Sequence, residues 1–148
     1  MSKIDKYIDK FKKALKKEGL NFTEQRYAVL KILFENVGHY DCEEIVQLIS
    51  EKKIKTSRAT VYRTLDILVK YDFARKLVLD DGVARYENKI ESSHHDHMIC
   101  IETGKIIEFY NKKIEDLQDE IAKKKGYEIV KHVHQLFVKR IKKWNINL

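Results

Sequence analysis

Several residue types that commonly organise a chain are absent or scarce in this sequence. Its 148 residues include no proline and only two cysteines, Cys42 and Cys100. Without a Cys-x-x-Cys pair, these two exclude a disulfide framework and a closed structural zinc site of thiolates. No apolar run approaches the roughly 18 residues of a membrane span, and Met1 to Lys17 intersperses lysine with apolar residues, unlike a signal peptide. We therefore expect a cytoplasmic protein that does not cross a membrane.

Charged residues, by contrast, are abundant. Lysine and arginine number 30 against 23 acidic residues, which gives a net charge of +7. A basic excess favours an anionic partner such as nucleic acid, although net charge describes solubility and steering rather than a site. Residues 1–93 hold 19 basic and 15 acidic side chains, and residues 94–148 hold 11 and 8. Net charge therefore does not show which face binds a partner. The periodicity of the apolar residues must locate that face instead.

The first half of the chain predicts a winged helix-turn-helix. Apolar residues recur at helical spacing in four stretches, and the lack of proline leaves capping residues and glycine to mark their ends. Asp81-Gly82 then separates two strand-like runs, 76–79 and 83–87, as in a hairpin. We assign residues 1–88 to this domain and the polar stretch 89–93 to a hinge. The stripe of Ile4, Ile8, Phe11 and Leu15 indicates the first helix, and the expected starts of the others are the N-caps Thr23 and Ser57, and Asp41 with Glu44 as a capping box.

Residues 94–148 predict a small α/β domain, so the fold class is α+β. Short strands at 97–101 and 105–109 precede a helix that Asn111 caps, and Gly126 follows this helix. The segment Tyr127 to Val138 is rich in Val, Ile and aromatic residues and predicts one long strand. About 55 residues are marginal as an isolated fold. We therefore expect the sheet to pair with a second copy in a homodimer.

The outward face of the fourth helix is the candidate DNA-reading surface. Arg63 can donate two parallel hydrogen bonds to guanine, Tyr62 can contact a thymine methyl group, and the small Ala59 permits close approach to a groove. The alternative is a solvated basic helix in a protein that binds no DNA. At about 100° per residue, the side chains opposite the apolar stripe Val61, Leu65 and Leu68 are Ala59, Arg63, Asp66 and Lys70, with Tyr62 on the flank. Candidates for phosphate contacts are Lys16, Lys17, Arg26, Lys53, Lys55 and Arg58.

The densest group of metal-binding residue types is His94-His95-Asp96-His97. In an extended chain, His94 and Asp96 face one side and His95 and His97 the other, so the tetrapeptide can serve two sites. Nitrogen and oxygen ligands suit Fe(II), Mn(II), Co(II), Ni(II) or Zn(II). Each candidate also has an ordinary interpretation, such as a loop histidine at 39 or half-buried strand histidines at 132 and 134. Further ligands must come from elsewhere, and the candidates are His39, Glu87, Glu108, Glu115 and His132.

Four motifs together resemble the ferric uptake regulator (Fur) family, with the likeness running from about Leu20 to Val138. This resemblance implies an N-terminal winged helix, a C-terminal α/β dimerisation domain and metal-dependent repression of iron-uptake genes at palindromic AT-rich operators. It also implies DNA contacts by Tyr62 and Arg63, within the candidate set Ala59, Thr60, Tyr62, Arg63, Arg26 and Lys16. The motifs are 59–65 (ATVYRTL), 85–87 (RYE), 94–100 (HHDHMIC) and 104–109 (GKIIEF).

The resemblance also divides the ligands into two sites. The regulatory site takes His39, Glu87, His95, His97 and Glu108, and the second site takes His94, Asp96, Glu115 and His132. For the tetrapeptide, this division matches the one that strand geometry gives independently. An ion at the regulatory site would cross-link parts that a hinge otherwise leaves mobile, and would so select the conformation that binds operator DNA.

Departures from the family pattern refine this expectation. Many members have Cys-x-x-Cys from the position of Cys100, whereas this chain has Cys100-Ile101-Glu102-Thr103 and no later cysteine. We therefore expect no structural zinc site of four cysteines. Asn21 stands where members often have lysine, and neither His134 nor the segment 139–148 with Trp144 has a family role.

Mixed His and carboxylate ligation resembles the iron-sensing branch. Glu108 differs from the aspartate of peroxide-sensing relatives, and zinc-sensing relatives usually recruit cysteine. We expect Fe(II) as the physiological ion, with Zn(II) or Mn(II) as substitutes, and a DNA-bound dimer or higher oligomer. The alternatives are a peroxide-, zinc- or manganese-sensing member, a metal-independent regulator or storage protein, and, more distantly, a metal-dependent hydrolase, which would leave the first four helices without a role.

Overall fold

The computed structural model describes residues 4–36, 38–89 and 95–142. The chain divides into two compact units, Met1–Ser92 and Ser93–Leu148. Of the predicted hinge at 89–93, only Lys89 belongs to the described residues, so the hinge stays a prediction. His94 and the end of the tail with Trp144 also lie outside these residues. Within the described ranges, no helix is long and apolar enough to cross a membrane.

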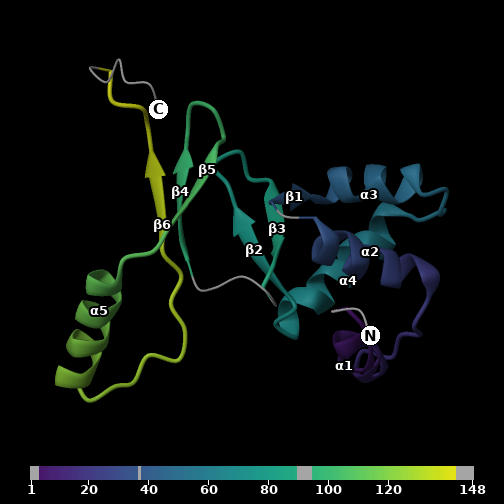
Figure 1. The fold of residues 1–148 in the computed structure, drawn as a ribbon, viewed down its shortest axis with the longest axis horizontal. Coiled ribbons are helices and arrows are strands. Elements are labelled where there is room, and N and C mark those ends of the chain that lie inside the picture. Colours follow the sequence, from purple (N-terminus) through teal and green to yellow (C-terminus); the bar gives the residue numbers. More distant parts are fainter. Residues whose placement is uncertain (1–3, 37, 90–94, 143–148) are drawn as a thin grey trace. The chain divides into compact units, whose positions relative to one another are not determined.

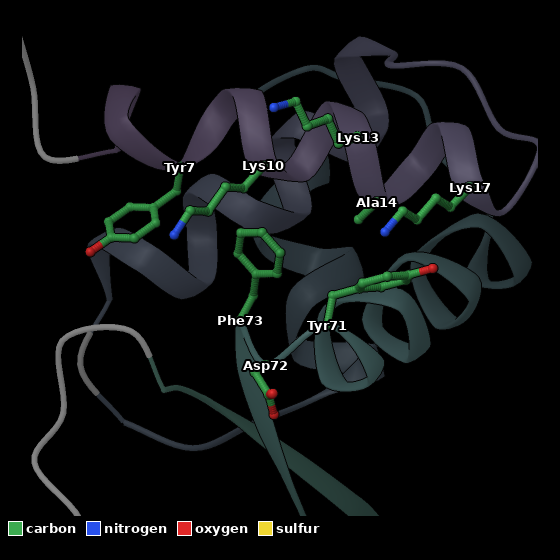
Figure 2. A pocket seen from close by; sticks show the side chains of 8 residues that line it. All are labelled: Tyr7, Lys10, Lys13, Ala14, Lys17, Tyr71, Asp72 and Phe73. Atoms are coloured by element: carbon green, nitrogen blue, oxygen red, sulfur yellow. The ribbon is translucent and has the colours of Figure 1, made fainter.

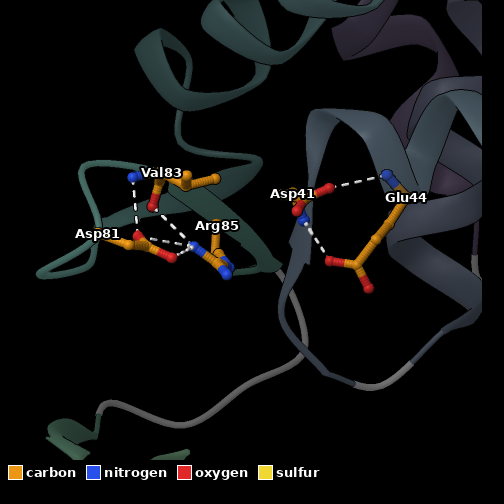
Figure 3. A network of polar contacts seen from close by, with 5 residues as sticks. All are labelled: Asp41, Glu44, Asp81, Val83 and Arg85. Atoms are coloured by element: carbon orange, nitrogen blue, oxygen red, sulfur yellow. Dashed lines mark hydrogen bonds and ion pairs between the residues drawn. The ribbon is translucent and has the colours of Figure 1, made fainter. Parts of the chain in front are cut away.

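The first unit contains the four predicted helices, each close to its expected position: α1 (Asp5–Lys17), α2 (Glu24–Glu35), α3 (Cys42–Glu51) and α4 (Arg58–Lys70) (Figure 1). The N-caps are confirmed, because the Thr23 hydroxyl accepts from Arg26 N and the Ser57 hydroxyl accepts from Thr60 N. The Asp41–Glu44 capping box also forms, with both hydrogen bonds present (Figure 3). Side chains that satisfy free backbone N–H groups thus determine where α2, α3 and α4 start, whereas α1 has no side-chain cap.

The core of the first unit forms between these helices. The predicted stripe of α4, Val61, Leu65 and Leu68, is fully buried. Helix α1 packs on this core through Phe11, whose ring lies 6.1 Å from that of Phe73 in an edge-on arrangement. Figure 2 shows Phe73 pointing toward α1, beside a pocket of about 380 Å³. This pocket is lined by Tyr7, Lys10, Lys13, Ala14, Lys17, Tyr71, Asp72 and Phe73.

The predicted wing is present as β2 (Ala74–Val78) and β3 (Ala84–Asn88), which pair antiparallel. In the turn between them, Asp81 accepts from Val83 N and from the Arg85 guanidinium (Figure 3). The hydrogen bond from Val83 N lowers the pKa of Asp81. Gly82 has a φ of +75° in this turn, a conformation that favours glycine. A third strand that sequence analysis missed, β1 (Tyr40–Asp41), extends the sheet in the order β1-β3-β2.

The second unit has the predicted order of strand, strand, helix and strand, so the predicted α+β class is confirmed. Strand β4 (Asp96–Cys100) lies between β5 (Ile106–Phe109), which is antiparallel to it, and β6 (Gln135–Val138), which is parallel. Helix α5 (Lys112–Lys124) follows β5, and the Asn111 side chain accepts from Lys113 N at its start.

The prediction of one long strand from Tyr127 to Val138 is wrong, because only Gln135–Val138 joins the sheet. The parallel register begins with His97 opposite Gln135, and β4 itself begins at Asp96. β4 therefore offers only Asp96 beside the residues that precede Gln135, so a long ladder cannot continue there. The β-branched residues that motivated the prediction, Val130 and Val133, are 98% and 72% exposed.

We predict that Ser57→Ala lowers the free energy of unfolding by about 1 kcal/mol, because the Thr60 N–H at the start of α4 loses its acceptor. Urea denaturation followed by circular dichroism measures this change. Ser50→Ala, at an exposed position near the end of α3, is the matched control. Equal effects of the two substitutions would contradict the capping role.

Candidate metal centres and nucleic-acid interface

Strand β4 places its ligand-type side chains on opposite sides of the sheet. Asp96 and His97 are adjacent on the strand, and they are 2% and 4% exposed. Asp96 contacts His132, whereas His97 lies beside the ring of His95, with 4.8 Å between the ring centroids. The alternation expected for an extended chain is therefore present for these residues. His94, which completes the predicted tetrapeptide, lies outside the described residues.

On one side of β4, three of the four residues predicted for the second site come together. Asp96 Oδ1 lies 3.0 Å from His132 Nε2, which lies 3.5 Å from Glu115 Oε1. One ligand atom from each residue lies within 4.8 Å of those of the other two. Two donor atoms that each lie about 2.0–2.2 Å from one ion are separated from each other by distances similar to these 3.0 and 3.5 Å separations. The donor set and its spacing therefore fit a divalent cation.

Three different elements supply these residues. Asp96 comes from β4, Glu115 from the first turn of α5, and His132 from the irregular segment before β6. Asn111 starts α5 so that Glu115 is in its first turn. Because His132 precedes the paired residues of β6, the backbone there is not tied to the strand ladder and can bring His132 toward Asp96. The segment that was wrongly predicted as a strand is therefore the one that supplies the candidate ligand His132.

In the first unit, the pairing of β1 with β3 brings a candidate pair together, because His39 directly precedes β1 and Glu87 lies on β3. Antiparallel pairing sets Tyr40 opposite Tyr86, so His39 comes opposite Glu87. His39 Nε2 lies 2.8 Å from Glu87 Oε2, and Arg75 approaches the other oxygen of this carboxylate at 3.5 Å. Sequence analysis listed both His39 and Glu87 as ligands, but a two-residue strand is too short for its pattern to predict how they meet.

In the second unit, the remaining residues of the predicted regulatory site lie together. The antiparallel register sets His97 opposite Glu108, and His95 Nε2 lies 3.3 Å from Glu108 Oε1. The five predicted ligands thus form two groups: His39 with Glu87 in the first unit, and His95, His97 and Glu108 in the second. Each group contains imidazole and carboxylate donors, which borderline and hard divalent ions accept.

Both cysteines are buried and free. Burial raises the pKa of Cys42 to about 11, so this residue stays a protonated thiol and a poor ligand. A hydrogen bond with the Thr103 side chain lowers the pKa of Cys100. Neither residue belongs to the groups of donors described above.

The outward face of α4 agrees with the sequence prediction. Ala59, Tyr62, Arg63, Asp66 and Lys70 are all exposed, whereas Thr60 is half-buried. Two basic side chains of this helix are engaged with acidic partners. Arg58 pairs with both oxygens of Glu43, and Lys70 pairs with Glu18 at 2.6 Å. Arg58 was a predicted phosphate contact, and its ion pair makes it a weaker candidate than Arg63.

A second basic feature lies where the N-termini of α2 and α4 approach each other. A pocket of about 400 Å³ is lined by both N-caps together with Arg26 and Lys55. Helix N-termini carry partial positive charge and free N–H groups, which favour phosphate. Arg26 and Lys55 are among the predicted phosphate contacts, but the pocket is not predicted, because the two N-caps lie far apart in the sequence. Its lining residues are Thr23, Gln25, Arg26, Lys55, Thr56, Ser57 and Thr60.

Comparison with known proteins gives consistent matches. Residues 17–137 match the model of the ferric uptake regulator family. The ferric uptake regulation protein of Campylobacter jejuni is 38% identical over 135 residues, which cover 90% of this chain and 85% of that protein. The protein of the same name from Helicobacter pylori is 36% identical, over 91% of this chain and 89% of its own.

Solved structures agree in fold. The H. pylori regulator, whose structure reveals three functional metal binding sites, has a TM-score of 0.83 at 34% identity and covers 94% of this chain and 92% of its own. The Pseudomonas aeruginosa regulator with manganese has a TM-score of 0.76 at 33% identity, over 88% and 97% of the two chains. These relatives are regulators, not hydrolases. The chain belongs to the ferric uptake regulator family.

Proposed function

We propose that this protein is a metal-dependent repressor of iron-uptake genes that acts in the cytoplasm and binds palindromic AT-rich operators as a homodimer. The observation that supports this most directly is the division of its nitrogen and oxygen donors between the two units. The first unit holds the His39–Glu87 pair and the second holds His95 and Glu108 at 3.3 Å. The same first unit presents the exposed face of α4.

In this proposal, one ion takes ligands from both groups and fixes one arrangement of the two units. The imidazoles and carboxylates would hold the ion, whose positive charge would draw them together. It would shift the conformational balance only by its differential affinity for the closed arrangement. To change the ratio of closed to open arrangements from 1:99 to 99:1, the ion must bind the closed arrangement more favourably by about 5.5 kcal/mol. Two recognition helices of a dimer then match half-sites about 34 Å apart.

Fe(II) is our proposed physiological ion because the donors are imidazole and carboxylate. Zn(II) and Mn(II) are expected substitutes, and zinc binds most such sites more tightly than Fe(II). Manganese is bound in the P. aeruginosa relative, and a zinc-bound manganese uptake regulator matches with a TM-score of 0.61. A manganese- or zinc-sensing role is therefore the second candidate function. Separate titrations of operator affinity with Fe(II), Mn(II) and Zn(II) would distinguish it from iron sensing.

Apolar exposure in the second unit supports the homodimer. Helix α5 has no buried residue, and its Leu117 and Ile121 are 56% and 49% exposed. Leu136 and Phe137 on β6 are also exposed. A second copy would remove this apolar surface from water at about 25 cal/mol per Å². With only two cysteines in the sequence, we propose that packing of these residues stabilises the dimer without a structural zinc of four thiolates.

The second site has a different proposed role. Its described residues, Asp96, Glu115 and His132, all belong to the second unit. An ion there would tie α5 and the segment before β6 to β4, and would stabilise that unit by about 2.7 kcal/mol when the free ion is at 100 times its Kd. This site would support the dimerisation unit, whereas the regulatory site would transmit the metal signal.

The double substitution His95→Ala with His97→Ala should abolish metal-dependent operator binding and leave the dimer intact. An anaerobic gel shift with Fe(II) or Mn(II), with and without chelator, measures the first effect, and size-exclusion chromatography measures the second. Lys105→Ala, in the exposed turn between β4 and β5, is the control. If the double variant retains metal-dependent binding, the regulatory assignment is wrong, and chelator-insensitive binding by the wild type would favour a metal-independent regulator.

Arg63→Ala should weaken operator binding by about 1–3 kcal/mol, roughly 5- to 150-fold, because a bidentate contact to a base or phosphate is lost. Arg58→Ala is the matched control on the same helix, since Arg58 pairs with Glu43. Fluorescence anisotropy with operator DNA at fixed salt measures both. Equal losses for the two variants would show that bulk charge, rather than the face of α4, determines affinity.

The pocket between the N-termini of α2 and α4 gives a separate prediction. Arg26→Ala with Lys55→Ala should weaken binding to all DNA sequences and lower the slope of log K against log salt by about 1 per phosphate contact. Lys112→Ala with Lys124→Ala, on α5, removes the same charge from the other unit and should leave the slope unchanged. The same slope in both double variants would exclude phosphate binding in the pocket.

A further inference from the structure

His134 has no role in the sites described so far, yet its position is fixed. It directly precedes β6, and its backbone carbonyl accepts from His97 N at 3.2 Å. The aromatic ring of Phe109 packs edge-on against its imidazole, with 5.7 Å between centroids. His134 follows His132 by two residues, and both imidazoles approach the carboxylate of Asp96. Main chain and ring contacts therefore hold this imidazole beside the second site.

The contact of His134 with Asp96 differs from that of His132. His132 Nε2 lies 3.0 Å from Asp96 Oδ1, whereas His134 Nδ1 lies 3.8 Å from Asp96 Oδ2. This carboxylate, only 2% exposed, therefore has an imidazole on each oxygen. The Nδ1 atom of His134 is itself buried. The group whose ligand atoms lie within 4.8 Å of one another comprises Asp96, Glu115 and His132, without His134.

In this arrangement, Asp96 has the position of a metal ligand, and His134 has the position of a residue that supports it. A carboxylate that gives one oxygen to an ion must have the other oriented and compensated, and a neighbouring donor commonly does this. A buried carboxylate also needs such compensation, since its desolvation is costly. The 3.8 Å separation is about 0.9 Å longer than a hydrogen bond, so the two groups are neighbours rather than hydrogen-bonded. In the tautomer that carries its hydrogen on Nδ1, the N–H faces this oxygen.

We propose that His134 is a positioning residue of the second site. Its Nδ1–H faces Asp96 Oδ2 and holds the carboxylate so that Oδ1 stays directed toward His132 and Glu115. The proposal rests on metal binding at the second site, which belongs to the proposed function. It gives a purpose to a histidine for which the family resemblance offers none.

The first test measures zinc affinity by competition with a chromophoric chelator. The full chain carries His95→Ala and His97→Ala, so that the proposed regulatory site does not contribute. His134→Leu, which keeps an apolar contact with Phe109, should lower the affinity of the second site 10- to 100-fold. His134→Asn places an amide N–H near the position of Nδ1 and should restore most of it. Unchanged affinity in His134→Leu, or no recovery in His134→Asn, would overturn the positioning role.

His132→Ala in the same background separates this proposal from the one on which it rests. Loss of zinc binding in His132→Ala, with none in His134→Leu, would refute the role of His134 alone. If His132→Ala also leaves zinc affinity unchanged, the second site itself is wrong. The melting temperature of the zinc-free protein should be nearly the same for His134→Leu and His134→Asn, and a fall that parallels the affinity would assign His134 a purely structural role.

A second test identifies the atom that faces Asp96. Side-chain ¹⁵N NMR of the zinc-loaded protein should show His134 with a proton on Nδ1, whereas His132 Nε2 should show the shift of a metal-bound nitrogen. A metal-bound shift at His134 Nδ1 would make His134 a direct ligand and overturn the positioning role. A proton on Nε2 alone would overturn it too, because no N–H would then face Asp96.

Discussion

Both groups of candidate ligands in the second unit depend on the alternation of side chains along β4. This strand is paired on both edges, with β5 and with β6, so its backbone cannot rotate to bring Asp96 and His97 to the same side. A slip of one residue in its register would exchange the two sides. The antiparallel register with β5 sets Glu108 opposite His97, and the parallel register with β6 starts just after His134. Strand pairing therefore keeps the donor groups apart.

Sequence analysis could predict the features that depend on neighbours along the chain. Thr23, Asp41 and Ser57 start helices because their side chains satisfy N–H groups two or three residues later, and that spacing is visible in the sequence. The exposed face of α4 follows from its period in the same way. The alternation within His94 to His97 likewise needs only an extended backbone.

The features that it could not predict depend on partners far away in sequence. Strand β1 exists only because Tyr40 and Asp41 meet β3, and two residues show no period. The strand expected from Tyr127 has the right composition, but β4 is too short to pair with its first eight residues. The ion pair between Arg58 and Glu43 depends on how α3 and α4 pack. Composition gives the capacity for these contacts, whereas tertiary structure decides which of them form.

The placement of the donors explains why two metal sites on one strand would serve different purposes. An ion held by Asp96, Glu115 and His132 contacts one unit only. In the proposed function, its binding energy would stabilise that unit but would not differ between arrangements of the two units, so it would not by itself control DNA binding. The regulatory donors that we propose are divided between the units, and an ion bound to all of them gains affinity only when the units adopt one arrangement. Under this proposal, tight binding would be useful at the second site, whereas at the regulatory site the affinity would have to match the range of metal concentration that the protein senses.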